Sequence, residues 1–181
     1  MILTTLVNAY EIETKGIDFT VNYSLPLPAD FAVDLNFQGN ILMQFDVNTG
    51  EVVDDRLGTL ANISDYDGSF AKFRFTANLS LSWKNFGLHN TVRYLGPVEY
   101  FKWDGGTPDD ITDDLPLHEY DAVAYWNLSA SVNWNKLDFS VGMDNVLDKK
   151  PAFIPGGDGN SNPNTYDFVG RYVFATASYK F

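Results

Sequence analysis

The chain has 181 residues and no cysteine, so it is long enough for one domain and offers neither disulfides nor thiolate metal ligands. Its formal net charge of −12 argues against nucleic acid as a partner, because phosphate binding needs a basic surface. Aromatic residues make up 15% of the chain and long helical patterns are missing, which predicts an all-β protein.

We interpret the first segment, Met1–Ala9, as the end of a strand. It has neither the positive region nor the cleavage site of a signal peptide. The apolar runs of the chain are short, as in Ala122–Trp126, and stay far below the roughly 20 residues that a transmembrane helix needs. If the chain crosses a membrane, we therefore expect it to cross with strands.

Seven segments alternate apolar and polar residues with a period of two, which is typical of strands with one apolar face. They are Gly16–Leu25, Phe31–Val47, Ala71–Trp83, Phe86–Tyr94, Ala122–Trp134, Leu137–Asp144 and Arg171–Phe181. In the second segment the pattern places Phe45 and Val47 on the apolar face and Gln44 and Asp46 on the polar face. Three residues break the alternation, namely Leu42, Asn90 and Phe174.

Short and long connections alternate along the chain. The short ones are Pro26–Asp30, Lys84–Asn85 and Asn135–Lys136, and the long ones are Asn48–Gly68, Phe101–Asp121 and Lys149–Gly170. This alternation is the rule for outer-membrane barrels, whose periplasmic turns are tight and whose outer loops are long.

Aromatic residues gather at the strand ends next to the short turns, as an interfacial girdle does. They are Tyr23, Phe31, Trp83, Phe86, Trp134, Tyr179 and Phe181. With Met1–Ala9 counted as a strand, the pattern predicts an antiparallel transmembrane β-barrel segment of about eight strands. A soluble β-sandwich is the alternative, because alternation alone does not tell which face is buried.

The last sixty residues contain a recognisable set of motifs. These are Tyr125-Trp126-Asn127-Leu128, Asn145-Val146-Leu147-Asp148-Lys149, Tyr166, Gly170-Arg171-Tyr172 and the terminal Tyr179-Lys180-Phe181. The set resembles the C-terminal end of TonB-dependent outer-membrane receptors, where the penultimate strand ends in a motif like NLFDK; here it reads NVLDK. Upstream, Lys15-Gly16-Ile17-Asp18 resembles the KGxE strand start that recurs in that family.

The resemblance implies a barrel of 22 strands with an N-terminal plug, which takes up a scarce ligand such as a siderophore, cobalamin or an oligosaccharide. Residues 1–181 then form a single segment, the C-terminal part of that barrel. The plug and the TonB box lie outside this segment, so TonB is a partner only through the missing N-terminal part. The implied location is the bacterial outer membrane, and the implied partners are the lipid bilayer, lipopolysaccharide and the barrel-assembly machinery.

The family gives Tyr179 and Phe181 a role as the signal read by the assembly machinery, and both also suit a membrane anchor. In physical terms, an exposed last strand pairs with the edge of the machine by strand addition. The alternative is that Phe181 is an interface anchor only. The motif residues carried over from the family are Asn145, Leu147, Asp148, Gly170 and Arg171.

Clustered carboxylates mark the loop Phe101–Asp121, chiefly Asp109, Asp110, Asp113 and Asp114. Oxygen ligands suit Ca²⁺, but the spacing is not that of an EF-hand, and a solvated acidic extracellular loop is the alternative. Charged residues on the polar face are expected to face a barrel lumen. They are Asp18, Asp34, Lys72, Arg74 and Asp138.

The sequence offers no catalytic or cofactor motif. His89 and His118 have no partner at metal-ligand spacing, and there is no nucleophile elbow, phosphate loop or catalytic triad. We therefore expect no enzyme activity, no cofactor and no resident metal. The main hypothesis is a transport component, and the alternative is a small self-contained eight-stranded barrel with a structural, adhesive or anchoring role.

Overall fold

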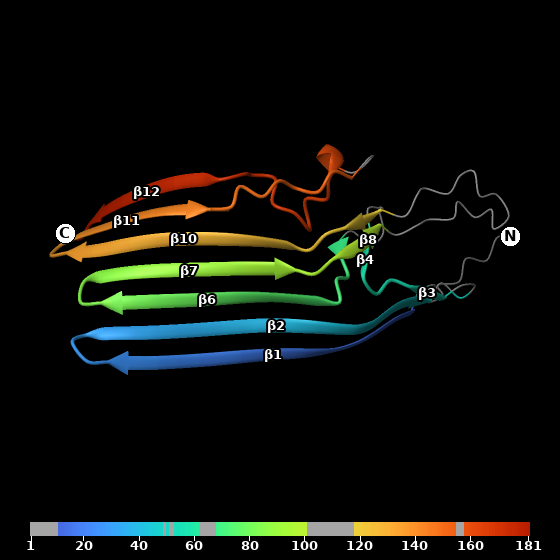
Figure 1. The fold of residues 1–181 in the computed structure, drawn as a ribbon, viewed down its shortest axis with the longest axis horizontal. Helices are drawn as coiled ribbons and strands as arrows, with labels where there is room; N and C mark the ends of the chain where they lie inside the picture. The colour runs from blue at the N-terminus through green and yellow to red at the C-terminus, as the bar shows by residue number, and fades with distance from the viewer. Residues whose placement is uncertain (1–10, 49, 51–52, 62–67, 101–117, 155–157) are drawn as a thin grey trace, which may run out of the picture.

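The computed structural model describes residues 11–48, 50, 53–61, 68–100, 118–154 and 158–181. Within them, seven long strands form an antiparallel meander with the order β1-β2-β6-β7-β10-β11-β12 (Figure 1). The strands are β1 (Glu11–Leu27), β2 (Phe31–Asn48), β6 (Phe73–Trp83), β7 (Phe86–Leu95), β10 (Val123–Trp134), β11 (Leu137–Asp144) and β12 (Tyr172–Tyr179). Each of the seven predicted strands is confirmed, with ends that shift by a few residues.

The long connections carry short strands of their own, at the end of the sheet opposite the short turns (Figure 1). One of them, β3 (Val53–Asp55), pairs with β2. The others form a second sheet in the order β5 (Gly68–Ser69), β4 (Thr59–Ala61), β8 (Val98–Tyr100) and β9 (Glu119–Tyr120). A single 3₁₀ turn, η1 (Asp158–Asn160), is described between β11 and β12. The segment 48–68, predicted as a long polar connection, thus contains the strands β3 and β4 among its described residues.

The described residues contain no helix with the length and apolar character needed to cross a lipid bilayer.

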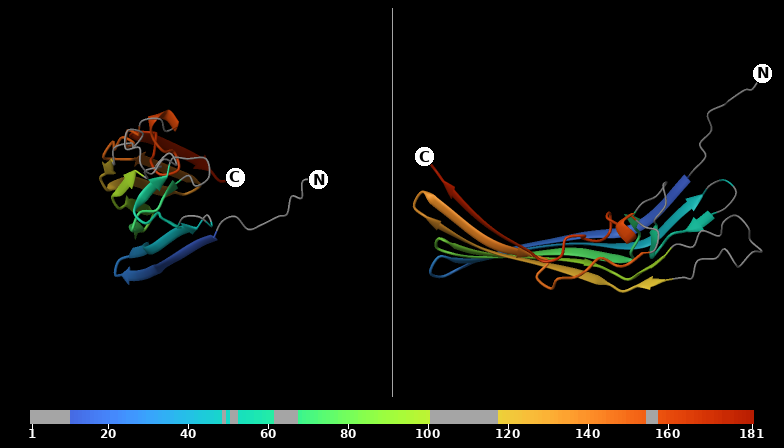
Figure 2. Two further views of the ribbon diagram at one scale, coloured as in Figure 1. Left: turned by 90° about the vertical axis from the view of Figure 1, so that its right-hand side faces the viewer. Right: turned by 90° about the horizontal axis from the view of Figure 1, so that it is seen from above.

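The main sheet is open, with β1 and β12 at its two margins (Figure 2). Within the described residues the sheet is therefore not closed into a barrel, as the alternative of a small self-contained barrel requires. Seven long strands are one fewer than the eight of the smallest barrels, and the expected eighth strand, Met1–Ala9, lies outside the described residues. Among the residues that the structure describes, both margins leave backbone N–H and C=O groups without a strand partner.

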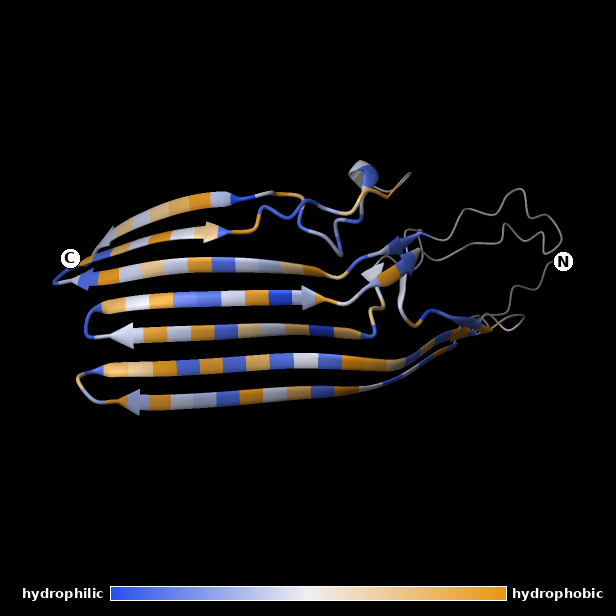
Figure 3. Ribbon diagram, viewed as in Figure 1, coloured by the Kyte–Doolittle hydropathy of each residue, from blue (hydrophilic) through white to orange (hydrophobic). Residues whose placement is uncertain are grey.

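The pairing gives the sheet one apolar and one polar face, and Figure 3 shows the alternation along every long strand. On the apolar face an aromatic row crosses four strands through Phe19, Phe37, Phe75 and Tyr94. Successive ring centroids lie 5.7, 5.2 and 5.1 Å apart. Phe19 also covers Gly39, which has no side chain of its own to fill that face.

On the polar face, side-chain hydrogen bonds run across the strands. Asn36 Nδ2 donates to Asn22 Oδ1 at 2.6 Å, and Asn78 Nδ2 donates to Asn36 Oδ1 at 3.2 Å. Thr91 Oγ1 continues the row by donating to Asn78 Oδ1 at 2.9 Å. Because these groups are paired across β1, β2, β6 and β7, the polar face is a connected network rather than a set of independent side chains.

A β-bulge corrects one prediction for β2. The register between β1 and β2 shifts at Lys15 and Gly16, where β2 contains one extra residue, Met43. A bulge changes which face the following residues occupy. Phe45 accordingly lines a cavity on the polar side of the sheet. The centroid of its ring lies 4.2 Å from the centroid of the Phe70 ring. Val47 is buried.

The same bulge places charged and amide groups beyond it on the other side. Lys15 Nζ lies 2.7 Å from Glu13 Oε1 and donates to Gln44 Oε1 at 2.7 Å. Gln44 in turn donates to Asp46 at 2.5 Å. The apolar face therefore ends at the bulge, and the last two residues predicted on it, Phe45 and Val47, lie on the other side. Gly16 is required there, because a Cβ would lie 2.7 Å from the carbonyl oxygen of Ile41.

Two other exceptions to the alternation have local partners. Asn90, on the apolar face, accepts a hydrogen bond of 3.4 Å from the indole N–H of Trp126. Phe174, on the polar face, is paired with Gly142 in the adjacent strand β11. Each exception is thus matched by a neighbour of complementary chemistry or size.

The short turns use left-handed backbone at Lys84 (φ 52°) and Asn135 (φ 60°). The registers place Phe31, Trp83 and Phe86 in one row, and the rings of Trp83 and Phe86 lie 6.0 Å apart. Leu137 likewise pairs with Trp134 in one neighbouring strand and with Tyr179 in the other. Tyr23 departs from the predicted row, because it pairs with Leu35, four residues from the end of its strand.

Candidate functional site

A small hydrophobic core fixes the long connections to the main sheet. It consists of Leu60, Ala71, Val98, Ile154 and Tyr166, with Leu95, Tyr120, Val123 and Ala152 packed around it. Its members come from the second sheet, from β7 and β10 and from the connection between β11 and β12. Burial raises the pKa of the Tyr166 hydroxyl to about 12. The core holds these connections over the polar face rather than the apolar one.

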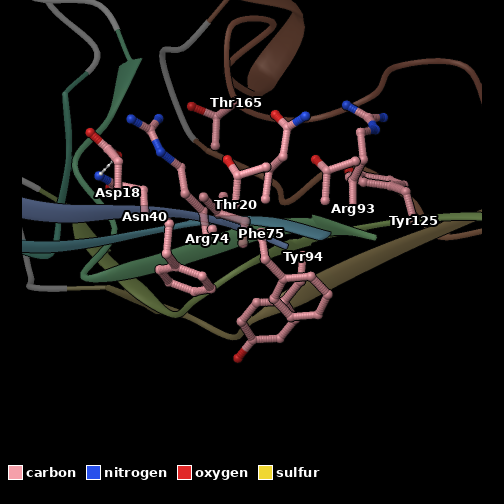
Figure 4. Close-up of a pocket in the computed structure, with 14 residues that line it drawn as sticks. Asp18, Thr20, Asn40, Arg74, Phe75, Arg93, Tyr94, Tyr125 and Thr165 are labelled. Atoms are coloured by element: carbon pink, nitrogen blue, oxygen red, sulfur yellow. Dashed lines mark hydrogen bonds between the residues drawn. The ribbon is translucent and has the colours of Figure 1, made fainter. Parts of the chain in front are cut away.

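A cavity of about 580 Å³ lies between the polar face and this connection. Its polar lining comes from five long strands and one loop, and most of it is labelled in Figure 4. The lining includes Asp18, Thr20, Gln38, Asn40, Arg74, Thr76, Arg93, Tyr125 and Thr165. Phe75 and Tyr94 point away from these groups, toward the apolar face. A second cavity of about 520 Å³ shares Asp18, Asn40, Arg74 and Thr165.

Arg93 ties the loop to the sheet on one side of the cavity. Its guanidinium forms an ion pair with Asp167 and lies 5.2 Å from the ring centroid of Tyr125. The Tyr125 hydroxyl accepts a hydrogen bond of 3.1 Å from the Asp167 backbone N–H. These three residues form a closed set of contacts, so that side of the cavity is already satisfied.

The opposite side of the cavity contains groups with unused hydrogen-bonding capacity. Arg74 makes no ion pair or side-chain hydrogen bond with the described residues. The Oγ1 atom of Thr165 and the Oδ1 atom of Asn40 are buried and have no hydrogen-bond partner there either. Asn40 donates through Nδ2 to Asp18 at 2.6 Å, which holds its amide in place. This part of the site is able to receive a polar ligand.

The motif residues after β11 form a structural joint and lie apart from the cavity. Asn145 is 2% exposed and adopts a left-handed φ of 50°. Its Nδ2 donates to the Lys149 carbonyl at 2.8 Å, and its Oδ1 accepts from the Lys149 N–H at 2.8 Å. Nδ2 also lies 3.4 Å from the Val169 carbonyl. Asn145 therefore ties the start of the connection to its end.

Asp148, Gly170 and Arg171 complete the joint. Asp148 Oδ1 accepts a hydrogen bond of 2.9 Å from the Arg171 backbone N–H, and Arg171 Nε donates to the Val146 carbonyl at 3.1 Å. The hydrogen bond from the Arg171 N–H, followed by that from Lys150, lowers the pKa of the Asp148 carboxyl. A Cβ at Gly170 would lie 2.7 Å from Asp148 Oδ1, so a larger residue there would displace the Asp148 carboxylate. Leu147 is half exposed beside the joint.

The C-terminus, Phe181, lies at the end of the sheet with the short turns (Figure 1), and Tyr179 is the last residue of β12. Neither residue lines the cavity. Their rings meet edge to face with centroids 5.2 Å apart, and both side chains are exposed. Lys136 Nζ lies 5.9 Å from the Tyr179 ring. The acidic residues Asp109, Asp110, Asp113 and Asp114 lie outside the described residues.

The two histidines make ordinary contacts. His89 Nδ1 lies 3.0 Å from Ser80 Oγ on the polar face, and His118 lies beside the ring of Tyr120. Among the positions that the structure describes, no three His, Cys, Asp or Glu side chains gather into a possible metal site. Of the charged residues predicted to face a lumen, Asp18 and Arg74 meet at the cavity, whereas Asp34 and Asp138 lie nearer the short turns.

Sequence reasoning missed Arg93, Tyr125, Thr165 and Asp167. Arg93 and Tyr125 fall on the polar face by period two, so that signal was present. Thr165 and Asp167 lie in an aperiodic connection, where spacing gives no indication of direction.

The comparisons with known proteins add no relative: no family model, no curated protein and no solved structure matches the chain. The fold nevertheless defines a class, that of all-β proteins built on an antiparallel meander of seven to eight strands.

Proposed function

We propose that this chain is the C-terminal barrel portion of a TonB-dependent outer-membrane receptor, which takes part in the uptake of a scarce ligand. The observation that carries the proposal is the exposed apolar face of the main sheet. Large apolar side chains on it include Ile17, Val21, Tyr23, Ile41, Met43, Trp83, Phe86, Leu88, Trp134, Phe139, Val141 and Val173. The exposed fractions of these side chains range from 36% at Leu88 to 69% at Trp134.

Such a continuous apolar surface is rare on monomeric soluble proteins, where it marks an interface with another protein or with a membrane. In a transmembrane barrel the same surface faces lipid, and the polar face lines the interior. In a soluble sandwich a second sheet covers the apolar face. The described second sheet packs on the polar side instead, through Leu95 and Val123. This arrangement supports the membrane proposal over the sandwich.

The open margins support a barrel larger than this chain. β1 spans 17 residues and β12 spans 8, and each has one unpaired edge within the described residues. Unpaired backbone groups are prohibitively costly in hydrocarbon, so the sheet needs further strands on both sides to cross a bilayer. The 22-stranded receptor barrel supplies them.

The joint between β11 and β12 supports the family assignment. Among the positions that resemble the receptor motif, Asp148 accepts a hydrogen bond from the Arg171 N–H, and the Asp148 N–H donates to the Asn145 carbonyl at 2.8 Å. Gly170 lies against the Asp148 carboxylate. A motif whose members depend on each other is more specific than separate matches. Tyr179 and Phe181 keep their proposed roles as membrane anchor and as the signal for the assembly machinery, with β12 as the strand that is added.

The membrane part of the proposal is tested with a matched pair of substitutions on β11. Val141→Arg places a charge on the apolar face, and Ser140→Arg places the same charge on the polar face one residue away. At the bilayer midplane an arginine facing lipid costs about 2–4 kcal/mol. Both substitutions are made in the full-length protein that carries this segment. We expect Val141→Arg to lower its protease-protected fraction in phospholipid vesicles more than tenfold, and Ser140→Arg to leave that fraction nearly unchanged. Equal effects, or a wild-type chain that is monomeric in buffer without detergent, contradict the proposal.

The receptor part is tested by the mass of the native protein that carries this C-terminus, isolated from outer membranes. A mass several times the 20.3 kDa of this chain supports a plugged receptor. A mass near 20.3 kDa favours the second candidate, a small self-contained barrel with a structural, adhesive or anchoring role.

A further inference from the structure

We propose that Arg74 anchors a binding site for a small polyhydroxylated oxyanion, such as a sugar acid, in the cavity between the sheet and the β11–β12 connection. The inference rests on the proposed function, because it takes the polar face as the side open to water and ligand. It goes further by assigning the site and the chemical class of its occupant.

Arg74 differs from the other arginines of the chain. Arg56 lies 3.3 Å from a carboxylate oxygen of Asp54, and Arg93 pairs with Asp167. Arg171 donates to a backbone carbonyl through Nε. Arg74 alone makes no comparable contact within the described residues, although Asp18 lines the same two cavities. A guanidinium with free N–H groups is the preferred bidentate partner of a carboxylate or phosphate group.

Two further groups define the rest of the ligand. Thr165 Oγ1 is buried without a partner in the described structure, and its hydroxyl is able to donate to an oxyanion or accept from a ligand hydroxyl. Asn40 Oδ1 is equally unsatisfied and only accepts. Buried polar atoms are rarely left without partners, so these two indicate an occupant with hydroxyl groups. Figure 4 shows Arg74 and Asn40 extending from the sheet toward Thr165.

The shape of the site favours a small molecule over a protein segment. The cavity of about 580 Å³ falls within the usual range of small-molecule pockets. Its roof is the connection that carries Thr165, which the Arg93–Asp167 ion pair and the Tyr125 hydroxyl hold against the sheet. The ligand therefore meets a largely preformed site.

Charge limits the choice of occupant. Asp18 also lines the cavity, and its carboxylate accepts a hydrogen bond from Asn40 rather than from Arg74. A ligand with several negative charges would be repelled by Asp18, whereas one oxyanion on Arg74 with hydroxyl groups toward Asn40 and Asp18 is accommodated. A singly charged sugar acid meets both requirements.

The test is a titration of the ¹⁵N-labelled full-length protein that carries these residues, purified in detergent micelles and followed through the Arg74 Nε–Hε signal. The main probe is D-glucuronate. D-Glucose lacks its carboxylate, cyclohexanecarboxylate lacks its hydroxyl groups, and glucose 6-phosphate replaces the carboxylate by phosphate. We expect a saturable shift with glucuronate, and binding at least about tenfold weaker for glucose, since a charged hydrogen bond is lost. Cyclohexanecarboxylate is expected to bind several-fold more weakly. Glucose 6-phosphate is expected to bind more weakly than glucuronate, because Asp18 repels its second negative charge.

Variants identify the residues responsible. Arg74→Gln is expected to weaken glucuronate binding about tenfold or more, read from amide shifts around the cavity, and Arg74→Lys to weaken it less. Thr165→Val removes the hydroxyl at nearly constant volume and is expected to weaken binding several-fold. Lys180→Gln is the control, because Lys180 pairs with Asp138 at 2.9 Å near the short turns.

Three outcomes overturn the proposal: no saturable shift with glucuronate, equal binding of glucose, or binding that Arg74→Gln and Thr165→Val leave unchanged. The glucuronate titration in micelles is independent of the vesicle experiment with Val141→Arg. A chain that fails to insert but binds glucuronate through Arg74 contradicts the membrane proposal and leaves the site standing, and the reverse result contradicts the site alone.

Discussion

The Phe174 ring lies over Gly142, so that a Cβ built on Gly142 would meet the Cζ atom of the ring at 2.3 Å. The two residues are direct partners across β11 and β12. An aromatic side chain that covers a glycine in the neighbouring strand stabilises the pair and fixes its register. This contact explains why a large apolar residue occupies the polar face at that point.

Gly142→Ala is expected to displace the Phe174 ring and to lower the free energy of unfolding by about 1–3 kcal/mol, the usual cost of overpacking. Chemical denaturation in micelles measures the change. The control is the double variant with Phe174→Leu, in which the alanine has room and its added cost is expected to shrink to a few tenths of a kcal/mol. A cost that persists in the double variant contradicts the assigned contact.

Asn145→Ala is expected to lower the free energy of unfolding by about 2–4 kcal/mol. The substitution leaves the backbone N–H and C=O of Lys149 without their partner and places alanine at a φ of 50°. Denaturant titration gives the value. Leu147→Ala, in the same motif but half exposed, is the matched control and is expected to cost less than half as much. Equal losses would contradict the central role of Asn145 in the joint.

Asp148 predicts a dependence of stability on pH. Its carboxyl pKa is lowered in the folded chain by the Arg171 backbone N–H and by Lys150. Since the folded pKa lies below the unfolded value of roughly 4, its contribution is present above that pH and is lost as the pH falls through the folded pKa. We expect Asp148→Asn to reduce the loss of stability between about pH 4 and pH 2.

The readout is the difference between the unfolding midpoints of wild type and Asp148→Asn, measured at several pH values. Taking the difference removes the contribution of the other carboxylates. Asp34→Asn, on the polar face near the short turns, serves as a control for the change of charge. A difference that stays constant with pH would contradict the role assigned to the Asp148 carboxylate.

Tyr166→Phe is expected to maintain or raise stability, by up to about 1–2 kcal/mol. The Tyr166 hydroxyl is buried and has no hydrogen-bond partner in the described residues, so its removal relieves a desolvation cost. Tyr166→Ala, by contrast, removes the ring from the loop core and is expected to cost about 3–5 kcal/mol. Thermal unfolding of both variants tests this, and a destabilising Tyr166→Phe would reveal an essential hydroxyl contact.

The strands of the main sheet were predictable because each one keeps a polar and an apolar face over eight or more residues. The prediction is wrong for Phe45 and Val47, since the bulge at Met43 inserts one residue without disturbing the apolar pattern of the sequence. The strands β3 and β4 have three residues each, too few for alternation to be recognised.

The candidate site was only partly predictable. Period two placed Asp18 and Arg74 on the polar face, and the structure brings them to one cavity. The partner of Arg93 was not predictable, because Asp167 lies 74 residues away in a connection without periodicity. For the motif residues, the sequence identified the positions but not their contacts. The resemblance singled out Asn145, Asp148 and Arg171, and the structure shows their hydrogen bonds.

The meander order of the sheet has a consequence for assembly. Neighbouring long strands follow one another in the chain, so each pairing brings together segments separated by one turn or one loop. Loop-closure entropy is then small at each step, and hairpins are able to form one after another without waiting for distant segments. In the proposed receptor barrel, the slow step that remains is the pairing of the β1 and β12 edges, which are open within the described residues, with the neighbouring strands of that barrel.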